Sequence, residues 1–163
     1  MTGENIGLEF RKVTDEIFEE FIELEVKPEQ KDNFYFRKTK PNLWTLAQGY
    51  VNHPYSKVLA VYDDQTLIGS VFYSPNANPH AEKREAWVVR LMIDQRYQGK
   101  GYGRQTMEFL LRRIHDENQG QRVRVGLSYE PHNKVAEGLY SSMGFEPSGE
   151  MLGDQFVVWK ILE

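Results

Sequence analysis

The chain has 163 residues, of which 40% are hydrophobic and 27% charged, with a formal net charge of -4 at pH 7. This length suits one domain with a sizeable core, and a single domain over residues 1–163 is expected. The negative balance argues against a nucleic-acid partner. The absence of cysteine excludes disulfides, thiolate zinc sites and cysteine nucleophiles. The polar start Met1-Thr2-Gly3-Glu4-Asn5 and the lack of long apolar runs predict a cytoplasmic protein with no membrane partner.

The first half of the chain predicts a meander of strands interrupted by two helices. Alternating apolar residues indicate three strands, at residues 8–13, 57–62 and 66–73. The last two form a hairpin around Asp63-Asp64-Gln65. Between the first two strands, Thr14 is expected to cap a helix that stops at Pro28. Thr45 is expected to cap a second helix that closes at His53-Pro54.

The second half alternates strands with helices. Strands are expected at residues 85–94, 123–129 and 155–162, and helices at residues 103–118 and 133–143. An extra short strand fits near Phe145. The strand–helix–strand crossover from residue 85 to residue 129 makes those two strands parallel. The fold class is therefore α/β (α+β), with a mixed central sheet flanked by helices on both faces.

The run Gln98-Gly99-Lys100-Gly101-Tyr102-Gly103 lies between a predicted strand and a predicted helix. Its alternate glycines let the backbone turn sharply and present several N–H groups to one point. The helix start adds unpaired N–H groups and the positive end of its dipole, and Arg96, Lys100 and Arg104 add side-chain charge. This pattern predicts a phosphate or pyrophosphate site. The spacing matches neither a P-loop nor a dinucleotide fingerprint, and a plain tight connection is the alternative.

Two motifs in order carry a family resemblance. They comprise Arg90-Leu91-Met92-Ile93-Asp94, then the run from Arg96 to Gly103, then Asn133, Ala136, Leu139-Tyr140 and Gly144-Phe145. With these motifs the chain resembles the GNAT superfamily of acetyl-coenzyme A-dependent N-acetyltransferases. The N-terminal half is similar to members that acetylate spermine, spermidine or diamines, at Gln30, Phe34, Thr45-Leu46-Ala47, Tyr50-Val51 and Leu67-Ile68-Gly69.

The resemblance implies a GNAT-like sheet, acetyl-CoA as cosubstrate and no metal. It assigns the pyrophosphate to the glycine turn and the pantetheine arm to the strand before it. The implied cofactor-binding residues are Leu91, Met92, Ile93, Gln98, Gly99, Lys100, Gly101, Tyr102, Gly103, Arg104 and Asn133. Tyr140 would protonate the departing thiolate as the general acid. A helix aromatic packed in the core is the alternative for Tyr140.

The general base is less defined by the sequence. Relatives that acetylate polyamines often carry an acid at the position of Val89, and this chain does not. Glu85 lies on the same strand with the parity of Val89 and is the candidate base. Tyr129, Glu130, a water chain or an already neutral amine are alternatives.

The first predicted helix is densely acidic. Its carboxylates are Asp15, Glu16, Glu19, Glu20, Glu23 and Glu25. These form either an acidic wall that attracts a polycation or simply a solvated face. The leading expectation is acetyl transfer to a primary amine, with a polyamine or diamine as acceptor and a homodimer as the assembly. An acetyltransferase for an aminoglycoside, amino acid or protein N-terminus, and a non-catalytic acyl-CoA-binding module, are the alternatives.

Overall fold

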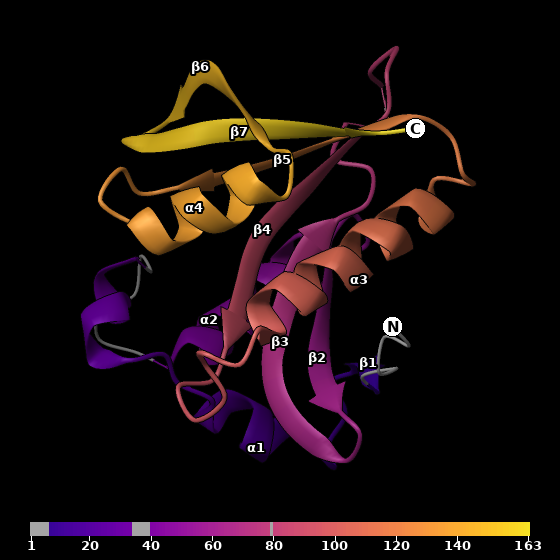
Figure 1. Cartoon of the computed structure of the whole chain (residues 1–163). Helices are drawn as coiled ribbons and strands as arrows, with labels where there is room; N and C mark the ends of the chain where they lie inside the picture. The colour runs from indigo at the N-terminus through magenta and orange to yellow at the C-terminus, as the bar shows by residue number, and fades with distance from the viewer. Residues whose placement is uncertain (1–6, 34–39, 79) are drawn as a thin grey trace, which may run out of the picture.

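The computed structural model of the chain describes residues 7–33, 40–78 and 80–163. Its elements are, in chain order, β1 (Leu8–Lys12), α1 (Phe18–Glu23), η1 (Pro28–Asn33), α2 (Pro41–Val51), β2 (Lys57–Asp63), β3 (Thr66–Ser74), β4 (Glu85–Ile93), α3 (Tyr102–Glu117), β5 (Val123–Tyr129), α4 (Lys134–Ser142), β6 (Glu146–Leu152) and β7 (Gln155–Leu162). The strands form one sheet in the order β1-β2-β3-β4-β5-β7-β6 (Figure 1). Among the described strands, only β4 and β5 pair in parallel, which confirms the predicted crossover. The extra strand near Phe145 is β6.

The helices cover both faces of the sheet, as predicted. Helices α3 and α4 lie on one face, and α1 and α2 lie on the other (Figure 1). Strand β4 contributes to both layers, because a bulge at Val89 shifts the alternation of its side chains. Val88 before the bulge belongs to the core under α3, whereas Met92 after it belongs to the core under α1. The mixed α/β sheet with two helical layers is therefore confirmed.

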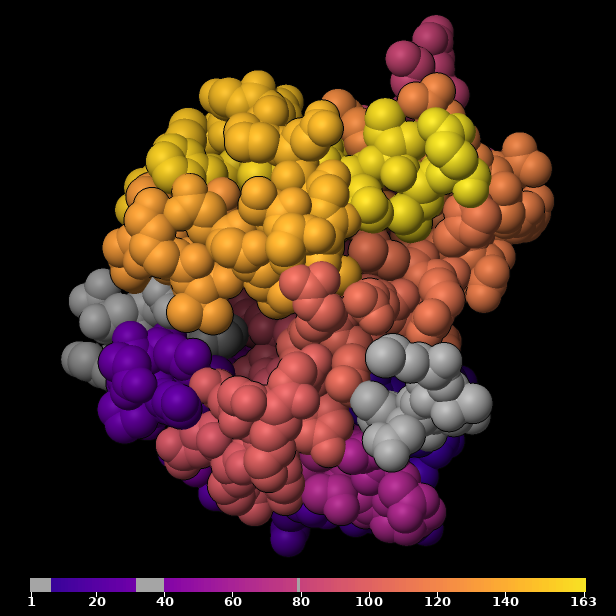
Figure 2. All heavy atoms as spheres, viewed as in Figure 1, coloured from indigo at the N-terminus to yellow at the C-terminus, as the bar shows by residue number. Residues whose placement is uncertain are grey.

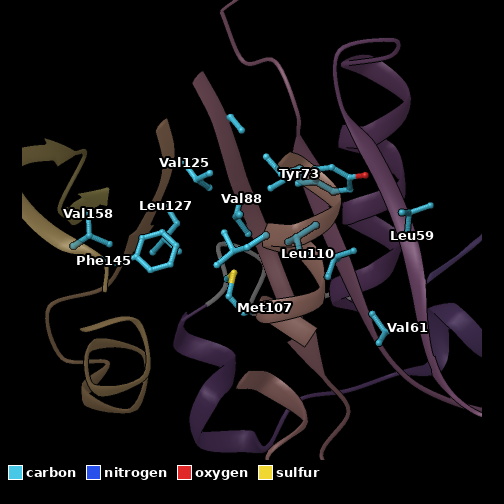
Figure 3. Close-up of a cluster of buried hydrophobic side chains, with 14 of the residues drawn as sticks. Leu59, Val61, Tyr73, Val88, Met107, Leu110, Val125, Leu127, Phe145 and Val158 are labelled. Carbon is cyan, nitrogen blue, oxygen red and sulfur yellow. The ribbon is translucent and has the colours of Figure 1, made fainter. Parts of the chain in front are cut away.

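Helix α3 anchors the larger core. Its buried residues Met107, Leu110, Leu111 and Ile114 follow the i, i+3, i+4, i+7 spacing of one helix face. They pack against Val88 and the neighbouring strands, as the close-up in Figure 3 shows. This packing fixes the start of α3, and with it the glycine turn, relative to the end of β4.

The starts of the first two helices differ from the prediction. Thr14 does not cap α1 through its side chain, because the helix begins only at Phe18. Thr45 lies inside α2, where its buried hydroxyl donates to Pro41 O at 3.1 Å. Helix α2 begins instead at Pro41, whose fixed φ and missing N–H suit the first helical position.

Candidate active site

The parallel strands β4 and β5 are paired along only part of their length. Their register joins Glu85–Trp87 to Arg124–Gly126, and within the described chain no pairing continues beyond it. Strand β4 nevertheless runs on to Ile93 and β5 to Tyr129. The two strands therefore separate toward their carboxyl ends and leave an opening in the sheet. The surface is hollowed between α4 and the turn before α3 (Figure 2).

The backbone of β4 presents hydrogen-bonding groups to this opening. The N–H of Asp94 donates to Ile68 O of β3 at 2.8 Å. Because N–H directions alternate along a strand, the N–H groups of Leu91 and Ile93 point away from β3, toward the opening. An extended chain placed in the opening can therefore pair with β4 as a neighbouring strand would.

The glycine turn ends in a row of unused donors. Among the described residues, no backbone N–H from Gln98 to Arg104 donates a hydrogen bond within the protein. The first helical bond of α3 is donated by Gln105 N–H to Gly101 O at 3.2 Å. These orphan donors lie at the positive end of the α3 dipole, which is the arrangement that binds phosphate in other proteins.

Glycine is required at two positions of this turn. Gly99 and Gly101 have φ values of 76° and 84°, in the left-handed region that other residues rarely adopt. A Cβ at Gly99 would meet no protein atom within 4 Å. The space in front of the turn is therefore free for a ligand to approach the backbone closely.

The predicted side chains of the turn have different neighbours. Lys100 is exposed to solvent, whereas the Arg104 guanidinium donates to Ser142 Oγ of α4 at 2.5 Å. The Tyr102 hydroxyl donates to the carboxylate of Asp63 at the end of β2. Lys100 and Arg104 thus add positive charge beside the orphan N–H groups, and Tyr102 fixes the first turn of α3 to the sheet.

Asp94 joins the end of β4 to the segment after α1. Its carboxylate is 2% exposed and accepts the backbone N–H of Glu25 at 2.9 Å and the Arg96 Nε at 2.7 Å. In return, Gln95 N–H donates to Glu25 O at 2.7 Å. Burial raises the pKa of Asp94, but its hydrogen bonds outweigh that effect and leave the pKa below the usual value. Sequence reasoning assigned Asp94 no separate role, although an acid directly after a strand was its signal.

Gln98 makes a second connection between the same parts. Its Nε2 donates to Ile93 O at 2.9 Å and to Gln30 Oε1 of η1 at 2.8 Å. The side chain therefore holds the turn against β4 and η1, while its backbone N–H belongs to the orphan row. The connections made by Asp94 and Gln98 tie the glycine turn and the end of β4 to the segment that follows α1.

Tyr140 lies where α4 meets the end of β5. Its ring centroid is 6.2 Å from that of Tyr129 and 5.7 Å from that of Phe145. Burial raises the pKa of Tyr140 to about 12. Its hydroxyl makes no hydrogen bond to the described residues. The structure therefore presents a phenol that stays protonated at neutral pH and has a proton to donate.

Asn133 is the N-cap of α4. Its Oδ1 accepts the N–H of Ala136 at 3.2 Å, which caps α4, and its own N–H donates to Glu130 O at 2.9 Å. Its side-chain NH2 donates to none of the described residues and can donate to a ligand. Asn133 thus positions the helix that carries Tyr140.

Glu85 lies away from this arrangement. It is at the amino end of β4, where the strands are still paired, and its carboxylate forms a 2.5 Å ion pair with Arg124. The parity argument that selected it fails because a bulge at Val89, between Val88 and Arg90, interrupts the alternation. We therefore drop Glu85 as the base.

The acidic residues around α1 are partly neutralised. The Lys40 ammonium lies 2.9 Å from a carboxylate oxygen of Glu23 and 2.7 Å from one of Glu25. Glu19 and Glu20 are exposed and form no ion pair with the described residues. Only part of the predicted acidic wall therefore keeps its charge uncompensated.

A model of the acetyltransferase (GNAT) family matches residues 15–145. The chain belongs to this family. It is therefore an acetyltransferase, and its opening between β4 and β5 and its glycine turn lie inside the matched region.

Three proteins that are similar to this acetyltransferase are themselves N-acetyltransferases. The spermine/spermidine N(1)-acetyltransferase of Bacillus subtilis (strain 168) is 27% identical over 148 residues, which cover 90% of this chain and 92% of the relative. A spermidine N-acetyltransferase from Vibrio cholerae, solved with CoA and spermine, has a TM-score of 0.70 at 19% identity and 97% coverage of both chains. An N-acetyltransferase from Thermoplasma acidophilum, solved with coenzyme A, has a TM-score of 0.66 at 20% identity, over 94% of this chain and 98% of the other.

In the described part of the acetyltransferase, no three His, Asp or Glu side chains group as metal ligands. No helix of that part is long and apolar enough to span a membrane. Phe34, one of the residues similar to polyamine acetyltransferases, lies outside the described residues.

Proposed function

We propose that this acetyltransferase transfers an acetyl group from acetyl-CoA to a primary amine of spermidine, spermine or a shorter diamine. The observation that carries the proposal is the continuity of three features around one opening. The unpaired edge of β4 leads in the chain to the orphan N–H groups of the glycine turn, and Tyr140 packs on Tyr129 at the end of β5, the strand on the other side of the opening.

The glycine turn is suited to the diphosphate of the cosubstrate. Its orphan N–H groups and the exposed Lys100 bind negative charge, and Gly99 and Gly101 allow the phosphates close to the backbone. The amide groups of the pantetheine arm match the free edge of β4, where Leu91 and Ile93 offer backbone partners. This chain therefore has complementary groups for both halves of coenzyme A.

The reaction requires an electrophilic carbonyl, a neutral amine and a proton for the thiolate. When bound, acetyl-CoA supplies the carbonyl as a thioester. A β4 N–H that points into the opening would hydrogen-bond the carbonyl oxygen as negative charge develops on it. Tyr140 would donate its proton to the sulfur, because burial keeps its phenol protonated. With Glu85 dropped, water or solution deprotonation of the amine supplies the neutral nucleophile.

A cationic acceptor is supported by two further facts. The relative from Bacillus subtilis, similar over 90% of this chain, is a spermine/spermidine acetyltransferase. Exposed carboxylates such as Glu19 and Glu20 raise the local concentration of a polycation, and salt weakens this attraction.

The test is thiol release from acetyl-CoA across a panel of amines. The panel contains spermidine, spermine, 1,4-diaminobutane, an aminoglycoside and an amino acid. We expect turnover with the polyamines and diamine, and weaker turnover as salt is raised. Acetylation of a neutral or anionic amine in preference to spermidine would exclude the polyamine assignment. Coenzyme A binding without thiol release for any amine would indicate a binding module.

A further inference from the structure

One carboxylate at the end of β5 is unused by the mechanism above. Glu130 follows the strand directly, and its Oε1 accepts a hydrogen bond from Gln155 Nε2 at 3.1 Å. Gln155 Oε1 in turn accepts the Ser128 hydroxyl at 2.6 Å. Because the hydroxyl occupies the amide oxygen, the amide NH2 is turned toward Glu130. This chain of contacts holds the carboxylate in one place, and its Oε2 has no partner among the described residues.

The position of this carboxylate follows from the alternation of the strands. Leu127 and Tyr129 of β5 belong to the core under α3 and α4, so Ser128 between them lies on the opposite face. Val158 of β7 also belongs to that core, so Gln155 lies on the opposite face with Ser128. Glu130, held by Gln155, is therefore on the face away from α3 and α4.

Tyr140 lies on the other side of the same strand end. Its ring contacts Tyr129, whose side chain is on the face of α3 and α4. The phenol and the Glu130 carboxylate thus border the end of β5 from opposite faces, next to the part of β5 that is no longer paired with β4. An acceptor that approaches from the face opposite Tyr140 meets Glu130.

On the same face of the sheet, β4 carries the charged residue Arg90. Arg90 projects toward α2, where its guanidinium donates to Thr45 Oγ1 at 2.6 Å and to Gln48 Oε1 at 3.2 Å. Burial lowers its pKa to about 10.

We propose that Glu130 binds an ammonium group of the acceptor other than the one that is acetylated, and that Gln155 positions Glu130 for this contact. This inference rests on the proposed function, since it requires an acceptor with at least two cationic amines. The geometry makes Glu130 a specificity-determining residue: it favours diamines and polyamines over monoamines of the same length.

The first test compares two acceptors that differ only in the second amine, 1,4-diaminobutane and n-butylamine. Glu130→Gln should lower kcat/KM for the diamine by about 5- to 10-fold, the effect of one partly exposed charged contact. The value for n-butylamine and the KM for acetyl-CoA should not change. Gln155→Met should lower the value for the diamine in the same direction by a smaller factor.

The matched control is Glu146→Gln. Glu146 is exposed on β6 and loses the same charge when substituted. An equal loss of kcat/KM for the diamine in Glu130→Gln and Glu146→Gln would overturn the site, because the net charge of the protein alone would then explain the loss. An equal loss for both amines, or no loss for either, would overturn the assignment of a distal ammonium site.

A binding measurement separates this inference from the catalytic proposal. Calorimetry measures the binding of 1,4-diaminobutane to the coenzyme A-saturated protein. We expect Glu130→Gln to bind the diamine more weakly than the wild type does. If the wild type binds the diamine more tightly than Glu130→Gln but transfers no acetyl group, the proposed function fails and Glu130 stands as a binding site for the diamine. If the wild type and the variant bind alike, or neither binds, the Glu130 site fails.

Discussion

At the scale of single residues, the role proposed for Tyr140 as general acid requires its phenol to hold its proton until negative charge develops on sulfur. Burial against Tyr129 and Phe145 meets that requirement by raising the pKa to about 12. The same low-polarity surroundings disfavour a free thiolate and so make the departing sulfur more basic. The interaction therefore acts on the transition state rather than on binding.

Tyr140→Phe should reduce kcat by about 10- to 100-fold, because the ring packing remains while the proton donor is lost. Coenzyme A affinity, measured by calorimetry, should stay nearly constant. A variant with full activity under conditions where chemistry is rate-limiting would make Tyr140 a packing residue.

The pH dependence of the wild type follows from the same residue. Because its pKa is raised to about 12, Tyr140 remains protonated through about pH 10, and kcat/KM should rise with pH as the amine loses its proton. The expectation would be contradicted if kcat/KM of the wild type fell with rising pH below about pH 10 and this fall disappeared in Tyr140→Phe.

Gly101→Val should abolish most of the thermal stabilisation by coenzyme A, because a branched side chain blocks the approach of phosphate to the turn. Ligand at 100 times its dissociation constant stabilises a fold by about 2.7 kcal/mol, or several degrees. The control is Gly138→Val. Gly138 lies in α4, away from the turn, and a Cβ there would meet no atom within 4 Å. An unchanged coenzyme A shift in Gly101→Val would argue against the turn as the phosphate site.

At the scale of elements, part-buried hydrogen bonds join the segment after α1 to the residues that follow β4, beside the apolar packing of Leu24 and Val26 against Met92. Asp94 and Gln98 cross between parts of the chain that are 68 or 69 residues apart. The position of the segment after α1 therefore depends in part on two side chains, one directly after β4 and one in the glycine turn.

Asp94→Asn should destabilise the fold at pH 7 by about 2–3 kcal/mol, since a buried amide NH2 faces N–H donors that the carboxylate accepted. The folded-state pKa of Asp94 is lowered, so its contribution is fully present above the unfolded value near 3.8 and is lost as pH falls through the folded value. Denaturant unfolding at pH 7 and at about pH 3 should show the difference shrinking in acid. A difference that does not change with pH would contradict the charged role.

Much of the element order could be predicted from the sequence, because alternation, helical spacing and turn residues are local signals. The glycine turn is also visible in the local sequence, whereas the role expected for Tyr140 came from the resemblance to the acetyltransferase family and stays a proposal. The bulge at Val89 could not be predicted, and it invalidated the parity that selected Glu85. The Glu130–Gln155 contact also depends on the register between β5 and β7, which only the folded sheet reveals.

At the scale of the whole molecule, the proposed reaction uses both faces of the sheet. Tyr140 packs on the face of α3 and α4, and we propose that the acceptor binds beside Glu130 on the opposite face. The opening between β4 and β5 connects the two. Assembly into a homodimer stays a prediction, which light scattering of the purified protein would check.

The most direct test of this account is to identify the product made from spermidine and acetyl-CoA by mass spectrometry. We expect one acetylated spermidine for each coenzyme A thiol released by the wild type, and a much slower yield of the same product with Tyr140→Phe. Thiol release without acetylated spermidine, or no reaction with spermidine while another class of amine is acetylated, would contradict the account.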